Sequence, residues 1–142
     1  MSNESDIQDA ILSFLDEALP EKVVEQAIPD SQLVPREPVS GQIQPMVALQ
    51  FGDLQQGQAY SFAGARGDDY ILPVYTQALA GDPRIARRLS NRVRNALLGM
   101  SFPWTGDIRK RPGGGMFPLV SSNGATEAYV YPASFGILIQ FE

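Results

Sequence analysis

The stretch GDPRIARRLSNRVRNALLG, residues 81–99, carries the clearest helix signal in the chain. Asp82 can cap a helix that begins at Pro83, because a carboxylate accepts backbone N–H groups without partners and proline loses no hydrogen bond at the first position. Gly99 suits a left-handed residue just past the end. At about 100° per residue, five apolar residues share one face: Ile85, Leu89, Val93, Ala96 and Leu97. The pattern predicts an amphipathic helix.

Arginine dominates the rest of this predicted helix. Four arginines turn away from the apolar face and a fifth lies at its border: Arg84, Arg87, Arg88 and Arg94, then Arg92. Leu98 also falls on the polar side, where an exposed leucine does not add to the stability of an isolated monomer. The arginine face is either an ordinary solvated surface or the contact surface for a partner.

Charge is distributed unevenly along the chain, whose net charge is −5. Residues 1–30 hold eight acidic side chains and one lysine, whereas residues 84–111 hold eight basic side chains and one aspartate. The second group ends in the basic triplet Arg109, Lys110 and Arg111. A molecule with two charged poles can attract copies of itself head to tail or meet opposite partners on two sides.

Composition limits the chemistry. A chain of 142 residues predicts one domain, and its eleven prolines and thirteen glycines predict many turns. The absence of cysteine and histidine excludes disulfides, Ser-His and Cys-His catalysis and the usual zinc sites. We therefore expect no enzymatic activity, no cofactor and no metal site. Catalysis that uses only carboxylates, lysine or tyrosine is the alternative that composition leaves open.

No membrane association is expected either. The acidic N-terminus lacks a secretory signal, and no apolar run approaches the length of a bilayer span. These features predict a soluble protein made inside the cell.

A second helix is predicted over residues 6–19. Ser5 and Gln8 have the spacing of a capping box, and Pro20 ends the run. Its apolar face gathers five residues: Ile7, Ile11, Phe14, Leu15 and Ala18.

The remaining segments predict strands and loops. Strands are expected over residues 22–28, 42–51, 70–79, 104–111, 116–120, 127–131 and 135–141, with a turn over 121–124 in which Asn-Gly supplies a positive φ. Extended loops are expected over about 29–41, 52–69 and 109–116. This order predicts an α+β fold, a mostly antiparallel sheet with two main helices packed on one face.

Short motifs add little. The Arg-Gly-Asp triplet at residues 66–68 is better explained as a glycine turn than as an adhesion motif. Asp68 and Asp69 would point to opposite faces of a strand, which argues against a cation site. Residues 113–115 are three glycines without the lysine and helix of a phosphate-binding loop.

The basic residues could contact phosphates through a salt-sensitive, sequence-independent attraction. A sequence pI near 4.7 and the lack of a recognisable nucleic-acid-binding motif argue against a dedicated reader of bases. The alternative is that these arginines pair with the carboxylates of a neighbouring copy.

The order of elements resembles the tail terminator proteins of long-tailed bacteriophages. The resemblance covers most of the chain and is carried by an acidic N-terminal helix ending in Leu-Pro and by the segments VVEQAIPD, SGQIQPMVALQFG, DPRIARRLSNRVRNALLG and YVYPASFGILIQF. It does not extend to the basic triplet, to the glycines at 113–115 or to residues 66–69.

The resemblance implies a single α+β domain over residues 1–142 that assembles as a ring, expected to be hexameric. Such a ring ends polymerisation of the tail tube and joins the tail to the head. Its partners would be copies of itself, the tail tube protein, the head-tail connector protein and DNA passing through the lumen, in a virion assembled in the host cytoplasm. Another connector, neck or head-completion protein, or a small nucleic-acid-binding module, is the alternative.

Overall fold

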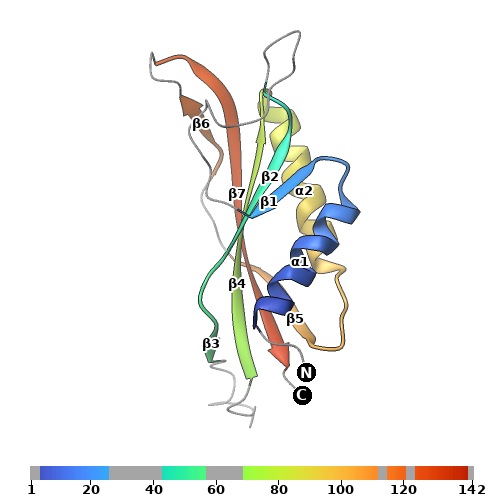
Figure 1. The fold of residues 1–142 in the computed structure, drawn as a ribbon. Coiled ribbons are helices and arrows are strands. Elements are labelled where there is room, and N and C mark those ends of the chain that lie inside the picture. The colour runs from blue at the N-terminus through green and yellow to red at the C-terminus, as the bar shows by residue number, and fades with distance from the viewer. Residues whose placement is uncertain (1–3, 26–42, 57–68, 112–114, 121–123, 141–142) are drawn as a thin grey trace.

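The computed structural model describes residues 4–25, 43–56, 69–111, 115–120 and 124–140, and places two helices beside a seven-stranded sheet (Figure 1). In chain order the elements are α1 (Glu4–Ala18), β1 (Lys22–Glu25), β2 (Met46–Phe51), β3 (Gln55–Gln56), β4 (Asp69–Ala80), α2 (Pro83–Leu98), β5 (Thr105–Arg111), β6 (Phe117–Val120) and β7 (Thr126–Gln140). Among these described strands, only β1 and β2 pair in parallel. The fold is α+β with a mostly antiparallel sheet, as the sequence predicts.

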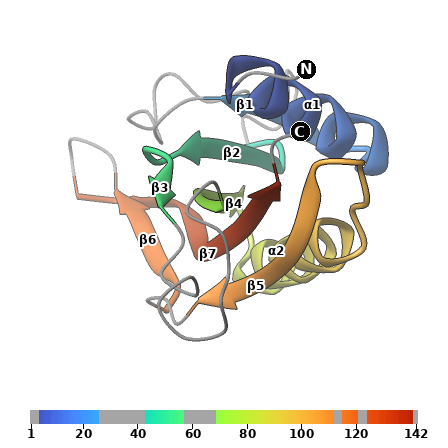
Figure 2. The same ribbon diagram turned by 90° about the horizontal axis from the view of Figure 1, so that it is seen from below.

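The long strands β4 and β7 form the centre of the sheet, paired from Asp69 with Gln140 to Ala80 with Tyr129. The outer edge of β4 is shared by β2 and β3, and the outer edge of β7 by β5 and β6 (Figure 2). The main strand order is therefore β1-β2-β4-β7-β5, with β1 and β5 at the two ends.

The prediction of separate strands over residues 127–131 and 135–141 is wrong, because β7 is continuous. Pro132 lies where β7 pairs with Gln77 of β4 but with neither β5 nor β6. A missing N–H donor is tolerated where one side of a strand has no ladder.

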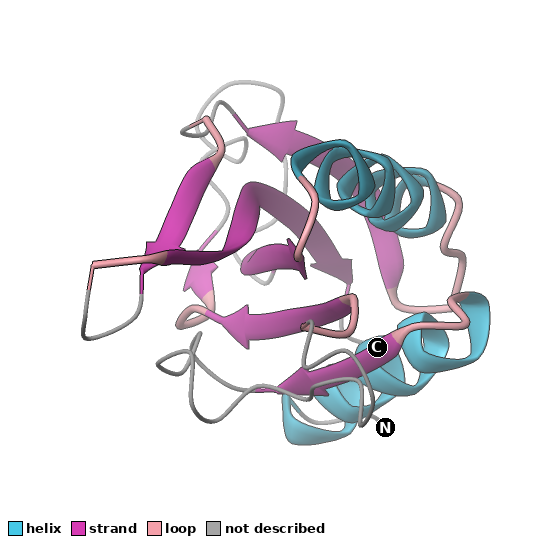
Figure 3. Ribbon diagram, turned by 90° about the horizontal axis from the view of Figure 1, so that it is seen from above, coloured by secondary structure: helices cyan, strands magenta, loops and turns pink. Residues whose placement is uncertain are grey.

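Both helices pack on one face of the sheet (Figure 3). Ile7, Ile11 and Leu15 of α1 and the predicted residues Leu89, Val93 and Leu97 of α2 are buried there. They meet alternate residues of the strands, which is the expected result of the two-residue period of a strand: Val47, Leu49, Leu72, Val74, Phe135, Ile137 and Ile139. Phe102 and Trp104 stack at 5.0 Å and close the layer beside Phe14.

The other face of the sheet is also partly covered. Ile43, Met46, Leu79, Ala128 and Val130 form a smaller buried cluster, with Leu119 of β6 packed against it. Four consecutive residues of β2 are therefore buried, although strict alternation predicts a strand with one buried face.

The ends of the helices differ from the predictions. Helix α1 begins at Glu4, so Ser5 lies inside it and is not the cap; acidic residues in the first turn favour this earlier start. Ala18 is exposed. Gly99 has φ −94°, and its N–H reaches the carbonyls of Asn95 and Ala96 in a right-handed ending instead of a left-handed one.

Ile85 is 42% exposed, contrary to its predicted place in the core. The buried face of α2 is centred instead on Ala86, Leu89, Ser90, Val93 and Leu97. Small residues at 86 and 90 let the helix approach the sheet closely, which leaves Ile85 at the side.

The predicted loops are partly corrected. Residues 29–41, the Arg-Gly-Asp triplet, residues 113–114 and most of the turn at 121–124 lie outside the described residues, and the strand predicted over 22–28 is described only to Glu25. Gly124 has the predicted positive φ, 87°. The interval 52–69 contains β3 and the start of β4, and residues 109–111 belong to β5 and not to a loop.

Candidate interaction surface

The five arginines of α2 differ in their exposure and in their ion pairs. Asp82 caps the helix by accepting a hydrogen bond from the backbone N–H of Arg84 at 2.7 Å, as predicted. The side chains of Arg84, Arg87 and Arg88 are exposed and make no ion pair within the described residues. They form an open cationic row at positions three and four apart, where neighbouring side chains lie on the same face.

Two other arginines have different surroundings. Arg92 Nη2 lies 2.8 Å from Glu21 Oε2, so this arginine joins α2 to the connection between α1 and β1. Arg94 is half-buried. The structure therefore separates Arg92 and Arg94 from the open row, although the sequence places all five on one candidate surface.

Leu98 lies on the polar side of α2 and is 45% exposed. Its neighbour Leu97 is fully buried. The two leucines mark the boundary between the face that holds the subunit together and the face that is open to a partner.

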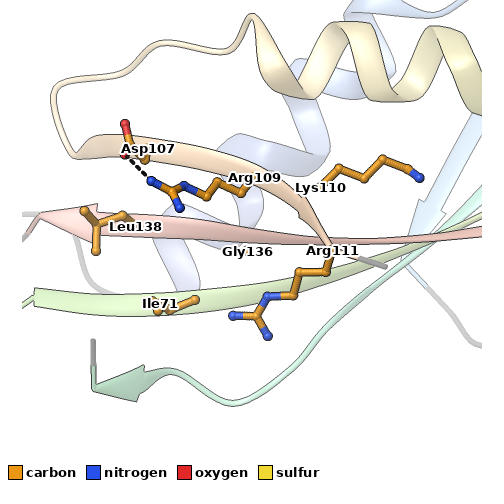
Figure 4. A pocket seen from close by; sticks show the side chains of 7 residues that line it. All are labelled: Ile71, Asp107, Arg109, Lys110, Arg111, Gly136 and Leu138. Atoms are coloured by element: carbon orange, nitrogen blue, oxygen red, sulfur yellow. Dashed lines mark hydrogen bonds and ion pairs between the residues drawn. The ribbon is translucent and has the colours of Figure 1, made fainter. Parts of the chain in front are cut away.

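The basic triplet is divided by the pleat of β5. Arg109 pairs with Gly136 and Arg111 with Ser134, whereas Lys110 pairs with Phe135, whose side chain is in the helix-side core. Side chains of successive strand residues point to opposite faces. Arg109 and Arg111 therefore lie on the face of the sheet away from the helices. The side chain of Lys110 points away from these two arginines (Figure 4).

Arg109 and Arg111 border a pocket of about 360 Å³. Its remaining lining comes from three strands and includes the apolar side chains Ile71 and Leu138. Arg109 Nη2 lies 3.5 Å from Asp107 Oδ2, and both side chains are mostly exposed. We call this site the β5 pocket.

Arg111 lies over the backbone of Gly136 in the β5 pocket. A Cβ atom at position 136 would be 2.9 Å from Arg111 Nε and 3.0 Å from Nη2. The absence of a side chain on Gly136 thus allows the guanidinium to lie flat beside the sheet. Within the described residues its N–H donors have no ion-pair partner.

Four residues that line the β5 pocket were not predicted from the sequence: Gly136, Ile71, Leu138 and Asp107. Only Gly136 carried a usable signal, because a glycine inside an otherwise apolar strand often marks close approach of another group. Asp107 lies two residues before Arg109 on β5, whereas Ile71 of β4 and Leu138 of β7 reach the site through strand pairing between segments far apart in the sequence.

Opposite charges lie at opposite ends of the strand order. Helix α1 packs against β1, and β5 lies at the other end of the strand order (Figure 2). Helix α1 presents the exposed carboxylates of Asp9, Asp16 and Glu17, whereas β5 carries the basic triplet. Asp9, Asp16 and Glu17 make no ion pair within the described residues. The two charged regions are different patches of one subunit, as a head-to-tail contact requires.

Several of these charges are unfavourable for their own helices. Asp16 and Glu17 lie in the last turn of α1, and Arg84 lies in the first turn of α2. The helix dipole favours the opposite signs at both places. These side chains therefore do not contribute to the stability of the helices that carry them.

Among the described residues, no group of three or more acidic side chains is arranged to hold a metal ion. None of the described helices is long and apolar enough to cross a membrane. No family model and no curated protein matches the chain.

Proposed function

We propose that this protein is a structural subunit that assembles head to tail into a closed ring. The observation that supports the ring most directly is the placement of opposite charges at the two ends of the strand order, on α1 beside β1 and on β5. A closed ring needs heterologous contacts, in which one patch meets a different patch of the next copy. Opposite charges at the two patches favour that pairing over contacts between like patches.

The resemblance in sequence suggests what such a ring does. In this proposal the protein is a bacteriophage tail terminator: a ring, expected to be hexameric, that caps the tail tube, ends its polymerisation and offers the surface for head joining. Its partners are further copies of the chain, the tail tube protein and the head-tail connector protein. A different connector, such as a neck or head-completion protein, would use the same kind of ring.

Native mass spectrometry and light scattering of the purified protein test the ring. We expect a discrete oligomer at low salt that dissociates as salt rises, because salt screens contacts between exposed charges. A protein that remains monomeric at every salt and protein concentration would contradict the proposal. Addition of the assembled ring to polymerising tail tube protein should then stop tube growth at a fixed length, while a terminator role fails if growth continues.

The open row formed by Arg84, Arg87 and Arg88 supports a second candidate, binding of nucleic-acid backbone without sequence preference. The variant Arg87→Glu/Arg88→Glu separates the two. Loss of the oligomer places the row at a subunit contact. An intact oligomer that loses salt-sensitive DNA binding places the row against DNA, as in a ring lumen, and a DNA-binding monomer favours the nucleic-acid module.

A further inference from the structure

Among the arginines that the structure describes, Arg111 is distinctive because it is unpaired and also lines a pocket. Arg92 is paired with Glu21, and Arg109 lies beside Asp107. The guanidinium groups of the open row on α2 are unpaired within the described residues and exposed on the helix surface. Arg111 alone among them lies over a glycine, in a pocket with apolar side chains in its lining.

The chemistry of the β5 pocket indicates the class of ligand. A guanidinium presents parallel N–H donors that match the two oxygens of a carboxylate or a phosphate. Ile71 and Leu138 add apolar surface beside this charge. The methylene groups of an acidic side chain can cover that surface, whereas a nucleic-acid phosphate supplies the charge alone. The pocket therefore favours a protein carboxylate over DNA backbone.

The outward face of α1 supplies such carboxylates. On α1, Asp16 follows Asp9 by seven residues and Glu17 follows Asp9 by eight. These spacings are close to two helical turns, so the three side chains lie along one side of the helix. They are exposed, unpaired within the described part of the chain and located at the opposite end of the strand order from β5. Asp16 and Glu17 also lie at the C-terminal end of α1, where the helix dipole disfavours negative charge. Their acidic side chains are therefore not accounted for by the stability of the helix.

We infer that the β5 pocket receives a carboxylate from the Asp16–Glu17 end of α1 of a second copy, and that Arg111 is the guanidinium that binds it. This inference rests on the proposed ring and specifies one contact within it. The contact is directional: each subunit gives its α1 to one neighbour and takes the α1 of the other neighbour into its pocket.

A charge exchange between two variants tests the contact. Variant A carries Arg111→Glu, and variant B carries Asp16→Arg and Glu17→Arg. In variant A the acidic end of α1 meets a carboxylate at position 111, and in variant B two arginines at the end of α1 meet Arg111. We expect each variant alone to need an about tenfold or higher protein concentration for assembly than the wild type.

An equimolar mixture of A and B should recover assembly. The acidic end of α1 of A fits the unchanged Arg111 of B, and the two arginines introduced in α1 of B fit the carboxylate that Arg111→Glu introduces in A. The ring should then contain alternating A and B subunits in equal numbers, which native mass spectrometry resolves by mass. Circular dichroism of each variant before mixing shows that it is folded.

Lys110→Glu is the matched control for position: it makes the same change of charge one residue away, also in the pocket lining, but at a residue that pairs with Phe135 and does not lie over Gly136. It should assemble much closer to the wild type than variant A. The conservative variant Arg111→Lys should assemble more weakly than the wild type, because an ammonium group lacks the planar pair of donors.

The outcomes separate this contact from the ring itself. A wild-type ring together with unimpaired assembly of A and B overturns the inference and leaves the proposed function standing. Impaired variants that do not assemble when mixed also overturn it, because the two charges then do not meet. Wild-type monomers overturn the proposed function and with it this contact. If A assembles normally but loses binding to DNA, Arg111 faces nucleic acid instead.

Discussion

Arg92 Nη2 and Glu21 Oε2 lie 2.8 Å apart and join the middle of α2 to the residue that precedes β1. Glu21 is the more buried partner: its side chain is 17% exposed, against 45% for Arg92. The other carboxylate oxygen, Oε1, is buried without a hydrogen-bond partner among the described residues. Arg92 is therefore the cation that keeps a nearly buried carboxylate paired.

Replacing Arg92 by alanine should destabilise the fold. The change leaves the Glu21 carboxylate without its ion pair in a site with little access to water, and we expect a loss of about 1–2 kcal/mol in the free energy of unfolding. Urea denaturation measures it. Arg87→Ala is the control, because Arg87 is exposed and unpaired within the described residues, and it should change stability by less than about 0.5 kcal/mol. Equal effects of the two substitutions would contradict the role given to Glu21.

Leu97 and Leu98 should respond very differently to truncation. Leu97→Ala removes a fully buried side chain and leaves a cavity, so we expect a loss of about 2–5 kcal/mol. Leu98→Ala should change the stability of the monomer by less than about 0.5 kcal/mol, because Leu98 is 45% exposed. The pair is compared by urea denaturation at a protein concentration where only monomer is present. A large loss for Leu98→Ala under those conditions would place it in the core.

Arg84→Glu should stabilise the monomer slightly. The substitution replaces a cation in the first turn of α2 by an anion, which the dipole favours by about 0.3–1 kcal/mol. Thermal unfolding at low salt measures the gain, which should shrink as salt is added. Arg88→Glu lies one turn further along the helix and should give a smaller gain. A loss of stability in Arg84→Glu would show that Arg84 makes a favourable contact in the monomer.

Gly136→Ala should displace Arg111 without unfolding the protein. The added methyl group would stand 2.9 Å from Arg111 Nε, and the long arginine side chain can move away. We expect a change of less than about 1 kcal/mol in stability but a weakening of assembly similar in direction to Arg111→Lys. Gly115→Ala is the control, because no atom lies within 4 Å of the added group. Urea denaturation and native mass spectrometry report the two effects separately.

Local signals were enough to predict α2 and β4. The cap at Asp82, proline at the first position and the period of Leu89, Val93 and Leu97 place α2 within its observed bounds. Strand β4 begins one residue before its predicted start and ends one residue after its predicted end. In both elements the residues that decide the boundary are close in sequence, so propensity and period are sufficient.

The features that the sequence could not predict depend on pairing between distant segments. Residues 127–131 and 135–141 look like two strands because Pro132 interrupts them, and only the continuous partner β4 holds them in one line. The division of Arg109 and Lys110 between two faces depends on the register with Gly136 and Phe135. The exposed position of Ile85 depends on how closely Ala86 and Ser90 approach the sheet, which periodicity alone does not determine.

The pairing of β4 with β7 also sets the order in which the chain can fold. Thr76 of β4 pairs with Ala133, 57 residues later, and every pair between the two central strands is similarly distant in sequence. Bringing together two strands that are so far apart in the sequence is slow. Until β7 has been synthesised, the edge of β4 that pairs with it has no hydrogen-bond partners, and the apolar side chains of β4 are incompletely covered. During translation the nascent chain therefore exposes the inner edge of β4, and the ribosome must release residues 126–140 before the core on either side of the sheet can close.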